Sequence, residues 1–304
     1  MKTRSPLWAR LYAAHDRRLP NHPGKRTMQR LLLRLVVRGG ARPFPWRVRN
    51  GAVLALTPLE GFAPYWTVGW TCLLTGVWEP HVERCIREVL RPGDRAVDVG
   101  ANLGYFATAM AQAVGPEGRV WAFEPVPATF ERLDLARELN GFHQLETRRL
   151  ALGRSAGFAT IAYDPRLSGN ASLYRQGEPD AEGVEIEVVV LDELVEADMV
   201  EPPQLLKLEV EGHELEVLHG ARETISRSLP AIIFELNQPL SERAGWSLVD
   251  IWELLRECGP YRFWLIEEDG LRPLDSPSFE LAPGDYVDVL ARADGPVDVQ
   301  DDLG

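Results

Sequence analysis

Cysteine and long apolar runs are scarce in this chain of 304 residues. Only three cysteines occur, Cys72, Cys85 and Cys258, and neither their odd number nor their spacing fits a disulfide framework or a zinc site. The apolar stretch at 31–37 is interrupted by Arg34, whereas a membrane-spanning helix needs about 20 apolar residues. We therefore expect reduced thiols, no bound metal, no signal peptide, no membrane span and a cytoplasmic location.

Lysine is scarce as well, and charge is unevenly distributed along the chain. Lys207 is the only one of the three lysines that lies beyond residue 49. Residues 1–49 hold 13 of the 33 basic residues and one of the 45 acidic residues, so a basic arm precedes a strongly acidic body. Because phosphate contacts need a basic surface, the acidic body argues against a nucleic-acid-binding domain. We expect the arm to dock on this body or on a partner, and the sequence carries no signal of an oligomeric state.

From about residue 80, helical and strand patterns alternate, which is typical of a mostly parallel sheet with helices on both faces. The pattern predicts parallel strands at 95–99, 119–123, 147–152, 205–210 and 231–236, with helices at 80–90, 103–114, 127–139, 213–226 and 248–258. It also predicts an antiparallel hairpin within 159–190 and an antiparallel closing pair at 261–267 and 286–291. Seven strands in this order are typical of the α/β, Rossmann-like fold of class I methyltransferases. The predicted organisation is a basic arm over 1–50, an approach segment over 51–80, a main domain over 81–295 with a hairpin insertion at about 155–190, and a tail over 296–304.

The strongest local pattern is the segment VDVGANLGYF, in which a strand ends, turns through Gly100 and Gly104, and opens a helix at Tyr105. The glycines let a ligand approach the backbone, and the helix N-terminus offers free N–H groups to a carboxylate. Asp98 beside the turn would repel a pyrophosphate but suits an ammonium group. The pattern of Asp98, Gly100, Asn102 and Gly104 therefore indicates a zwitterionic ligand, such as the methionine end of S-adenosylmethionine, and we expect Tyr105 to contact it as well. An ordinary strand-to-helix turn is the alternative.

A second motif, WAFEP, ends the next predicted strand. Its Glu124 lies 20 residues past Gly104, the spacing at which an acid accepts the hydroxyls of a ribose in nucleotide-binding folds. Pro125 ends the strand and fixes the following turn, and we expect it to line the cofactor site beside Glu124. Leu150 and Ala151 end the predicted third strand, where we expect apolar and backbone atoms to face an adenine.

The third motif is LKLEVEGHELEVLHGA, on the predicted fourth strand and the helix after it. Strand alternation predicts that Lys207, Glu209 and Glu211 share one face. Glu209, Glu211 and His213 fall at the carboxyl end of the strand, where a substrate lies in such sheets. Burying these ionisable groups is costly unless they pair or react. For Lys207 and Glu209, a buried ion pair that ties the sheet together is the alternative to a catalytic role.

Taken together, these motifs resemble the FkbM-type S-adenosylmethionine-dependent methyltransferases over about residues 52–292. The resemblance also includes the segments GVWE at 76–79, GNASL at 169–173 and LDEL at 191–194. The family pattern usually reads Lys-x-Asp-x-Glu-Gly, and Glu209 stands here where the family has the aspartate.

The resemblance implies methyl transfer from S-adenosylmethionine to a hydroxyl of a sugar, a macrolide or another secondary metabolite. An alcohol needs a general base, and we expect Glu211 or His213 to fill that role, with Lys207 or Glu209 tuning its pKa or orienting the acceptor. The expected acceptor-binding residues are Glu79, Asn170, Ser172, Glu235 and Asn237. The histidines at 15, 22, 81 and 143 are interpreted as incidental.

Other readings remain open at this point. The same fold can methylate nitrogen or a carboxylate, and it can also carry a nicotinamide-dependent oxidoreductase or a non-catalytic binding protein. The loop containing Asp98 and Asn102 disfavours the nicotinamide reading, since that cofactor binds through a pyrophosphate. A magnesium ion on Glu209 and Glu211 is conceivable, but no further ligand cluster is visible in the sequence.

Overall fold

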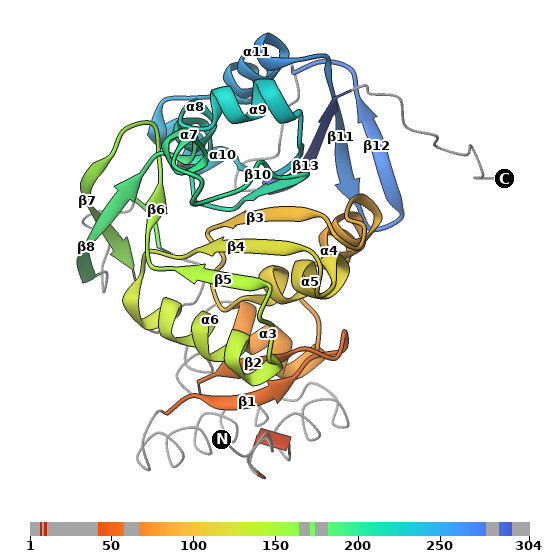
Figure 1. Cartoon of the computed structure of the whole chain (residues 1–304), viewed down its shortest axis with the longest axis vertical. Helices are drawn as coiled ribbons and strands as arrows, with labels where there is room; N and C mark the ends of the chain where they lie inside the picture. The colour runs from red at the N-terminus through yellow and green to blue at the C-terminus, as the bar shows by residue number, and fades with distance from the viewer. Residues whose placement is uncertain are drawn as a thin grey trace, which may run out of the picture.

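The computed structural model describes residues 42–57, 67–163, 171–173, 182–277 and 286–293, together with Leu7, Ala9 and Arg10. Its largest sheet comprises β3 (Arg95–Val99), β4 (Arg119–Phe123), β5 (Leu145–Arg148), β9 (Leu205–Leu208), β10 (Ala231–Asn237), β11 (Tyr261–Glu267), β12 (Gly270–Leu274) and β13 (Tyr286–Ala293). In that part of the chain the strand order is β12-β11-β13-β10-β9-β3-β4-β5 (Figure 1). Strands β10, β9, β3, β4 and β5 are parallel, and β13 is antiparallel to β10 and β11. This is the predicted α/β sheet with one strand, β12, added at its edge.

Helices cover both faces of the sheet (Figure 1). One face carries α4 (Pro80–Val89), α5 (Tyr105–Val114) and α6 (Pro127–Asn140), and the other carries α7 (Leu191–Glu196), α8 (Glu214–His219), α9 (Arg222–Ser228) and α11 (Leu248–Cys258). Strand alternation explains the division, since Ala96 and Leu205 pack toward the first set while Val97 and Leu206 pack toward the second. Both faces are therefore apolar, which accounts for the nearly continuous hydrophobic runs of the central strands.

The N-terminal part of the described chain forms a hairpin that the sequence analysis did not predict. Strands β1 (Phe44–Arg47) and β2 (Val53–Leu56) pair antiparallel across residue 50, the predicted boundary between arm and approach segment. Asn140 of α6 binds both backbone groups of Val53 at 2.8 Å, and the Nε of Arg132 donates to the carbonyl of Ala55 at 2.9 Å. The hairpin thus extends the α4–α6 layer away from the sheet (Figure 1).

A smaller three-stranded sheet confirms the predicted hairpin insertion. It contains β6 (Ala151–Leu152), β7 (Gly157–Tyr163) and β8 (Glu182–Val189), with β7 and β8 antiparallel. The predicted strand at 147–152 is wrong in its second half. Its pairing in the main sheet ends at Arg148, and Ala151 already belongs to the smaller sheet, where it pairs with Val188. Leu150 and Ala151 therefore lie where the chain passes from one sheet to the other.

Two further boundaries differ from the prediction. The strand predicted at 205–210 ends at Leu208, and Glu211 (φ 53°) and Gly212 (φ 99°) turn away from it, so Glu211 does not share a strand face with Lys207. The helix predicted at 213–226 is divided into α8 and α9 at Gly220, where a Cβ would lie 2.0 Å from the carbonyl oxygen of Gly153. Helices α3 (Val68–Thr75), α7 and α10 (Gln238–Ala244) were not predicted.

The three cysteines are buried free thiols, as expected. No helix within the described ranges is both long and apolar enough to cross a membrane.

Candidate active site

The loop between β3 and α5 brings the ends of three strands together. Gly100 (φ 77°) and Ala101 both donate their N–H groups to the carbonyl of Phe123, which ends β4, at 2.9 Å. A Cβ on Gly100 would lie 1.9 Å from the carbonyl oxygen of Glu209, just past β9, so only glycine fits this crossing. Asn102 also has a left-handed backbone, with φ of 50°. The loop is therefore pinned between β4 and β9 at the carboxyl edge of the sheet.

Glu124 lies beside this loop, where the WAFEP motif predicted it. One carboxylate oxygen accepts the N–H of Asn102 at 3.0 Å and the other accepts the N–H of Val126 at 2.9 Å. Burial raises the pKa of Glu124 to about 7, although the two N–H groups favour the charged form. Since a carboxylate oxygen has two lone pairs, each can accept a further hydrogen bond from a ligand hydroxyl.

A cavity with about 790 Å³ of empty space, open to solvent in part, lies at this edge. It gathers nine of the residues predicted from the sequence: Gly100, Asn102, Glu124, Pro125, Leu150, Ala151, Glu209, Glu211 and His213. Its remaining walls are mainly apolar and include side chains that the sequence analysis did not single out: Phe123, Leu152, Ile161, Tyr163, Ala171, Leu173 and Ile186. Most of these come from the inserted hairpin and the GNASL segment, whose position depends on the tertiary fold.

A smaller cavity of about 220 Å³ shares the walls formed by Gly100, Asn102 and Glu209. Tyr105 and Lys207, both predicted as site residues, line it together with Trp78 and Phe106 among others. Both cavities thus border the same glycine turn. Asp98 and Gly104 line neither cavity, and Gly104 instead packs against α6, where a Cβ would lie 2.8 Å from Leu133.

Lys207 forms the buried ion pair that the sequence left as an alternative. Its Nζ lies 2.5 Å from Glu209 and 3.6 Å from Asp98, and 4.6 Å from the centre of the Phe106 ring. Burial by itself would lower the pKa of Lys207, but Glu209 and Asp98 outweigh it and raise the pKa above its ordinary value. Burial raises the pKa of Asp98 to about 6, against the attraction of Lys207. Lys207 is therefore a fixed cation rather than a proton acceptor.

The turn after β9 is held from two sides. The carboxylate of Glu214, which the sequence analysis missed, accepts the N–H groups of Val210 at 3.0 Å and Gly212 at 3.4 Å. The hydroxyl of Ser172 donates to the carbonyl of Glu211 at 2.7 Å. Ser172 therefore supports the loop and is fully buried, whereas Asn170 lies outside the described residues.

His213 follows the same turn and directly precedes α8. Burial lowers its pKa, against the opposing effect of Glu216, so the imidazole is neutral at pH 7 and can accept a proton. His213 lines the larger cavity together with Glu211.

The other predicted acceptor residues lie on the α4 side of the carboxyl edge. The register of β10 and β13 places Glu235 opposite Asp288 and Asn237 opposite Tyr286. Burial, with the negative charge of Glu209 and Asp288 added, raises the pKa of Glu79 well above its ordinary value. Glu235 has its pKa raised in the same way, by burial and then by the carboxylates of Glu211 and Glu209. Glu79 and Glu235 therefore belong to one acidic group beside Lys207.

His81 is part of this acidic group, although the sequence led to its interpretation as incidental. Its Nε2 lies 3.1 Å from Asp288, and the two residues are separated by 207 positions in the chain. An acid in the apolar strand YVDVLA is the one local signal for Asp288. The structure describes no group of three or more His, Cys, Asp or Glu side chains arranged to hold a metal ion.

The residues of the larger cavity fit an adenosyl cofactor with an amino-acid end. The side-chain oxygen of Asn102 is buried and accepts no hydrogen bond from any described residue, and Glu124 keeps its outer lone pairs. Together with the strand order, these features define a class I methyltransferase that depends on S-adenosylmethionine. The family model of the methyltransferase FkbM domain matches residues 98–263, more than half of the chain. The chain belongs to the FkbM methyltransferase family.

Individual relatives are distant. The hexuronic acid methyltransferase AglP of Haloferax volcanii is 29% identical over 236 residues, which cover 73% of this chain and 90% of that protein. Methyltransferase 1 of Beauveria bassiana is 29% identical over 177 residues, covering 52% of this chain and 71% of that protein. Among solved structures, the FkbM methyltransferase of Methylobacillus flagellatus matches with a TM-score of 0.42 and 17% identity, over 77% of this chain and 56% of that one.

Proposed function

We propose that the protein transfers a methyl group from S-adenosylmethionine to a hydroxyl oxygen of a small molecule, such as a sugar or a secondary metabolite. One observation carries this proposal: the turn after β9 places Glu209, Glu211 and His213 on the wall of the cofactor cavity. Charged and proton-accepting groups thus adjoin the place where a methyl group would be delivered.

The cofactor-binding roles follow the geometry of the larger cavity. Glu124 accepts the ribose hydroxyls, and Leu150 and Ala151 face the adenine. The turn from Gly100 to Asn102 receives the methionine end, at the start of α5. When bound, S-adenosylmethionine supplies an electrophilic methyl group on a sulfonium.

The chain itself must orient the acceptor and remove one proton. His213, neutral because of its burial, or the carboxylate of Glu211 takes the proton of the hydroxyl. Lys207 keeps its charge and holds the carboxylate of Glu209 at a fixed position beside the turn. Alignment of the acceptor oxygen with the methyl group supplies the remaining rate acceleration, because displacement at a methyl group needs an in-line approach.

A polyhydroxy acceptor is supported by the polar edge next to the cavity. Glu79, Glu235 and Asn237 offer oxygen acceptors to hydroxyl groups. The relative AglP is by its name a hexuronic acid methyltransferase, which supports a sugar acceptor. The acidic body supports a small molecule rather than a nucleic acid as acceptor.

The test uses S-adenosylmethionine with a carbon-13-labelled methyl group and a panel of neutral glycosides, amino sugars, uronic acids and macrolides. We expect label on oxygen, identified by the carbon chemical shift, with one equivalent of S-adenosylhomocysteine released per methyl group. Glu211→Gln combined with His213→Gln lowers turnover by about a hundredfold or more, because no proton acceptor is left beside the acceptor hydroxyl. Label on nitrogen or on a carboxylate contradicts the proposal, and so does undiminished turnover in the double variant.

A further inference from the structure

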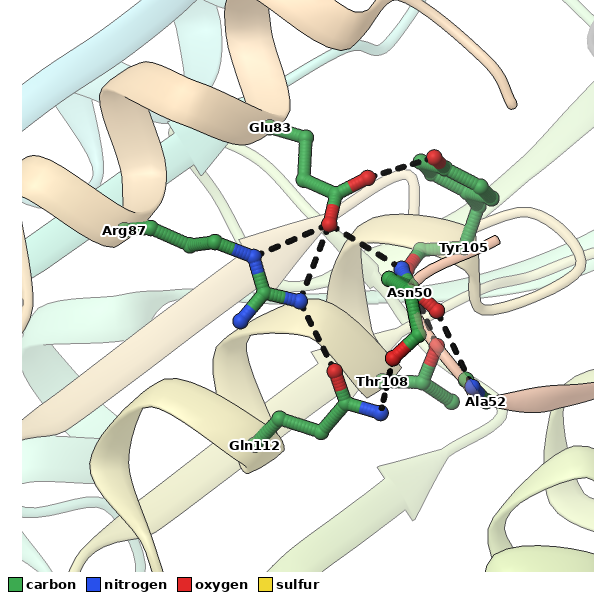
Figure 2. Close-up of polar contacts among 7 residues, drawn as sticks. All are labelled: Asn50, Ala52, Glu83, Arg87, Tyr105, Thr108 and Gln112. Carbon is green, nitrogen blue, oxygen red and sulfur yellow. Dashed lines mark hydrogen bonds and ion pairs between the residues drawn. The ribbon is translucent and has the colours of Figure 1, made fainter. Parts of the chain in front are cut away.

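A buried carboxylate outside the cavities joins three separate segments of the chain. Glu83 of α4 accepts hydrogen bonds from the hydroxyl of Tyr105 at 2.5 Å, from Nδ2 of Asn50 at 3.1 Å and from Nε of Arg87 at 2.9 Å (Figure 2). Glu83 is only 9% exposed, and its hydrogen bond with Tyr105 is buried, while those with Asn50 and Arg87 are partly buried. Arg87 also forms an ion pair with this carboxylate, and hydrogen bonds in which a partner is ionised are the stronger kind.

The partners of Glu83 are themselves held in place. Asn50, in the turn between β1 and β2, accepts the N–H of Ala52 at 3.0 Å with its side-chain oxygen. Arg87 donates to Gln112 of α5 at 2.8 Å, and Gln112 in turn donates to the carbonyl of Asn50 at 3.4 Å (Figure 2). The β1–β2 hairpin, α4 and α5 are thus tied together around one carboxylate.

Tyr105 connects this network to the site. It is the first residue of α5, directly after the turn that begins at Gly100, and its ring lines the smaller cavity. The ring meets Phe106 edge to face with centroids 5.4 Å apart, and Lys207 lies over the ring of Phe106. A change in the position of Tyr105 therefore moves both the start of α5 and the surroundings of Lys207.

The hairpin also holds a second segment that lines the smaller cavity. Nε1 of Trp46 donates to the carbonyl of Cys72, and the N–H of Arg49 donates to the carbonyl of Gly76 at 2.8 Å. These bonds fix the segment that carries Val68 and Trp78, which line the same cavity as Tyr105 and Phe106. Both parts of the lining are thus tied to a hairpin that lies before the family match at 98–263.

We propose that Glu83 is a positioning residue for the cofactor: through the hydroxyl of Tyr105 it fixes the loop that receives the methionine end, and through Asn50 it makes the β1–β2 hairpin part of the cofactor site. The inference rests on the placement of the methionine end given under the proposed function. It assigns no contact between Glu83 and the cofactor.

Two ligands separate positioning from general stability. S-adenosylhomocysteine carries the amino-acid end, whereas methylthioadenosine shares its adenosine part and lacks that end. We expect Tyr105→Phe and Asn50→Ala each to weaken S-adenosylhomocysteine binding by about tenfold, measured by calorimetry, because each removes one charge-assisted hydrogen bond. Methylthioadenosine binding stays within about twofold of the wild type, and the double variant weakens binding by less than the product of the two single effects.

Asn140→Ala is the matched control, since it breaks two of the hydrogen bonds between the hairpin and α6 without touching Glu83. It lowers the melting temperature and leaves the affinity for both ligands unchanged. Glu83→Gln keeps an acceptor oxygen and weakens binding less than Glu83→Ala. Equal losses for both ligands, unchanged S-adenosylhomocysteine binding in Tyr105→Phe, or the same pattern in Asn140→Ala would overturn the proposal. A wild-type protein that binds neither ligand contradicts the cofactor site itself, which is a different result.

Discussion

Glu124 carries the clearest consequence at the scale of single residues. Its carboxylate is buried and has a pKa raised to about 7, yet a ribose hydroxyl donates to it best when it is ionised. If Glu124 holds the ribose as proposed, binding of the cofactor competes with a proton at this position. Asp98, also buried, and Lys207 contribute to the same local field.

We predict that S-adenosylhomocysteine binds about tenfold more weakly at pH 6 than at pH 8, because Glu124 must lose its proton before it can accept two hydroxyls. Calorimetry at several pH values measures the effect. Glu124→Gln weakens binding at every pH and removes most of the slope. A slope that survives in Glu124→Gln assigns the titration to another group.

The structure gathers most of the predicted cofactor residues around one cavity but none of the predicted acceptor residues that it describes, and the difference lies in how each set was recognised. Glu124 and Gly100 belong to short motifs, in which a strand end and the following turn fix the spacing. His81 and Asp288 meet only because β13 inserts beside β10, which no local pattern expresses. The roles predicted for the site residues remain predictions that the experiments above address.

The turn between β3 and α5 shows how one element constrains another. Gly100 has a left-handed backbone and lies against the carbonyl of Glu209, so the loop and the end of β9 share one position. Gly93 has a similar left-handed backbone, with φ of 90°, but nothing lies within 4 Å of its missing Cβ. Substitutions at Gly93 and Gly100 therefore separate the cost of a left-handed backbone from the cost of a steric clash.

We predict that Gly93→Ala lowers the free energy of unfolding by about 1 to 2 kcal/mol, the cost of a left-handed backbone. Gly100→Ala adds a clash with a backbone atom and lowers it by about 3 kcal/mol or more, with loss of cofactor binding. Urea unfolding and calorimetry measure the two effects. Equal losses of unfolding free energy in the two variants would show that the backbone near Glu209 moves to accommodate the added Cβ at little cost.

The elements that sequence predicted correctly are those whose cause is local. Strands β3 and β4 match their predicted ranges, because each is a buried apolar run bounded by turn residues. The division of α8 from α9 depends on the contact between Gly220 and Gly153, which are distant in the chain. The β1–β2 hairpin was missed because its support comes from α4, α5 and α6.

At the scale of the whole molecule, three buried carboxyl groups at the sheet edge oppose folding when ionised. Burial raises the pKa of Asp98 to about 6 and those of Glu124 and Glu214 to about 7. The folded protein keeps these protons in the range from about pH 4 to about pH 7, where the unfolded chain releases them. The contribution of these groups to stability therefore falls as pH rises through this range. The lowered pKa of His213 acts in the opposite direction.

We predict that Glu214→Gln gains stability relative to the wild type as pH rises from 5 to 7.5, on the order of 3 kcal/mol, because the variant has no proton to lose there. Urea unfolding of both proteins without cofactor at several pH values measures the difference. Below about pH 3.5 the difference between the two proteins becomes constant, since the carboxyl group is then protonated in both states. A difference that does not change with pH would show that Glu214 is ionised throughout.

The position of β13 also sets an order of events during synthesis. By the time His213 has been translated, the loop after β3, Glu124 and the turn after β9 have all been made. Strand β13 is made more than 70 residues later and must enter the sheet between β10 and β11. Because a chain folds from its N-terminal part as it emerges, the part of the sheet that carries this loop, Glu124 and this turn can assemble first. Asp288 and Tyr286 arrive last, so the partner of His81 and one side of the acidic edge are completed only when the final strand closes the sheet.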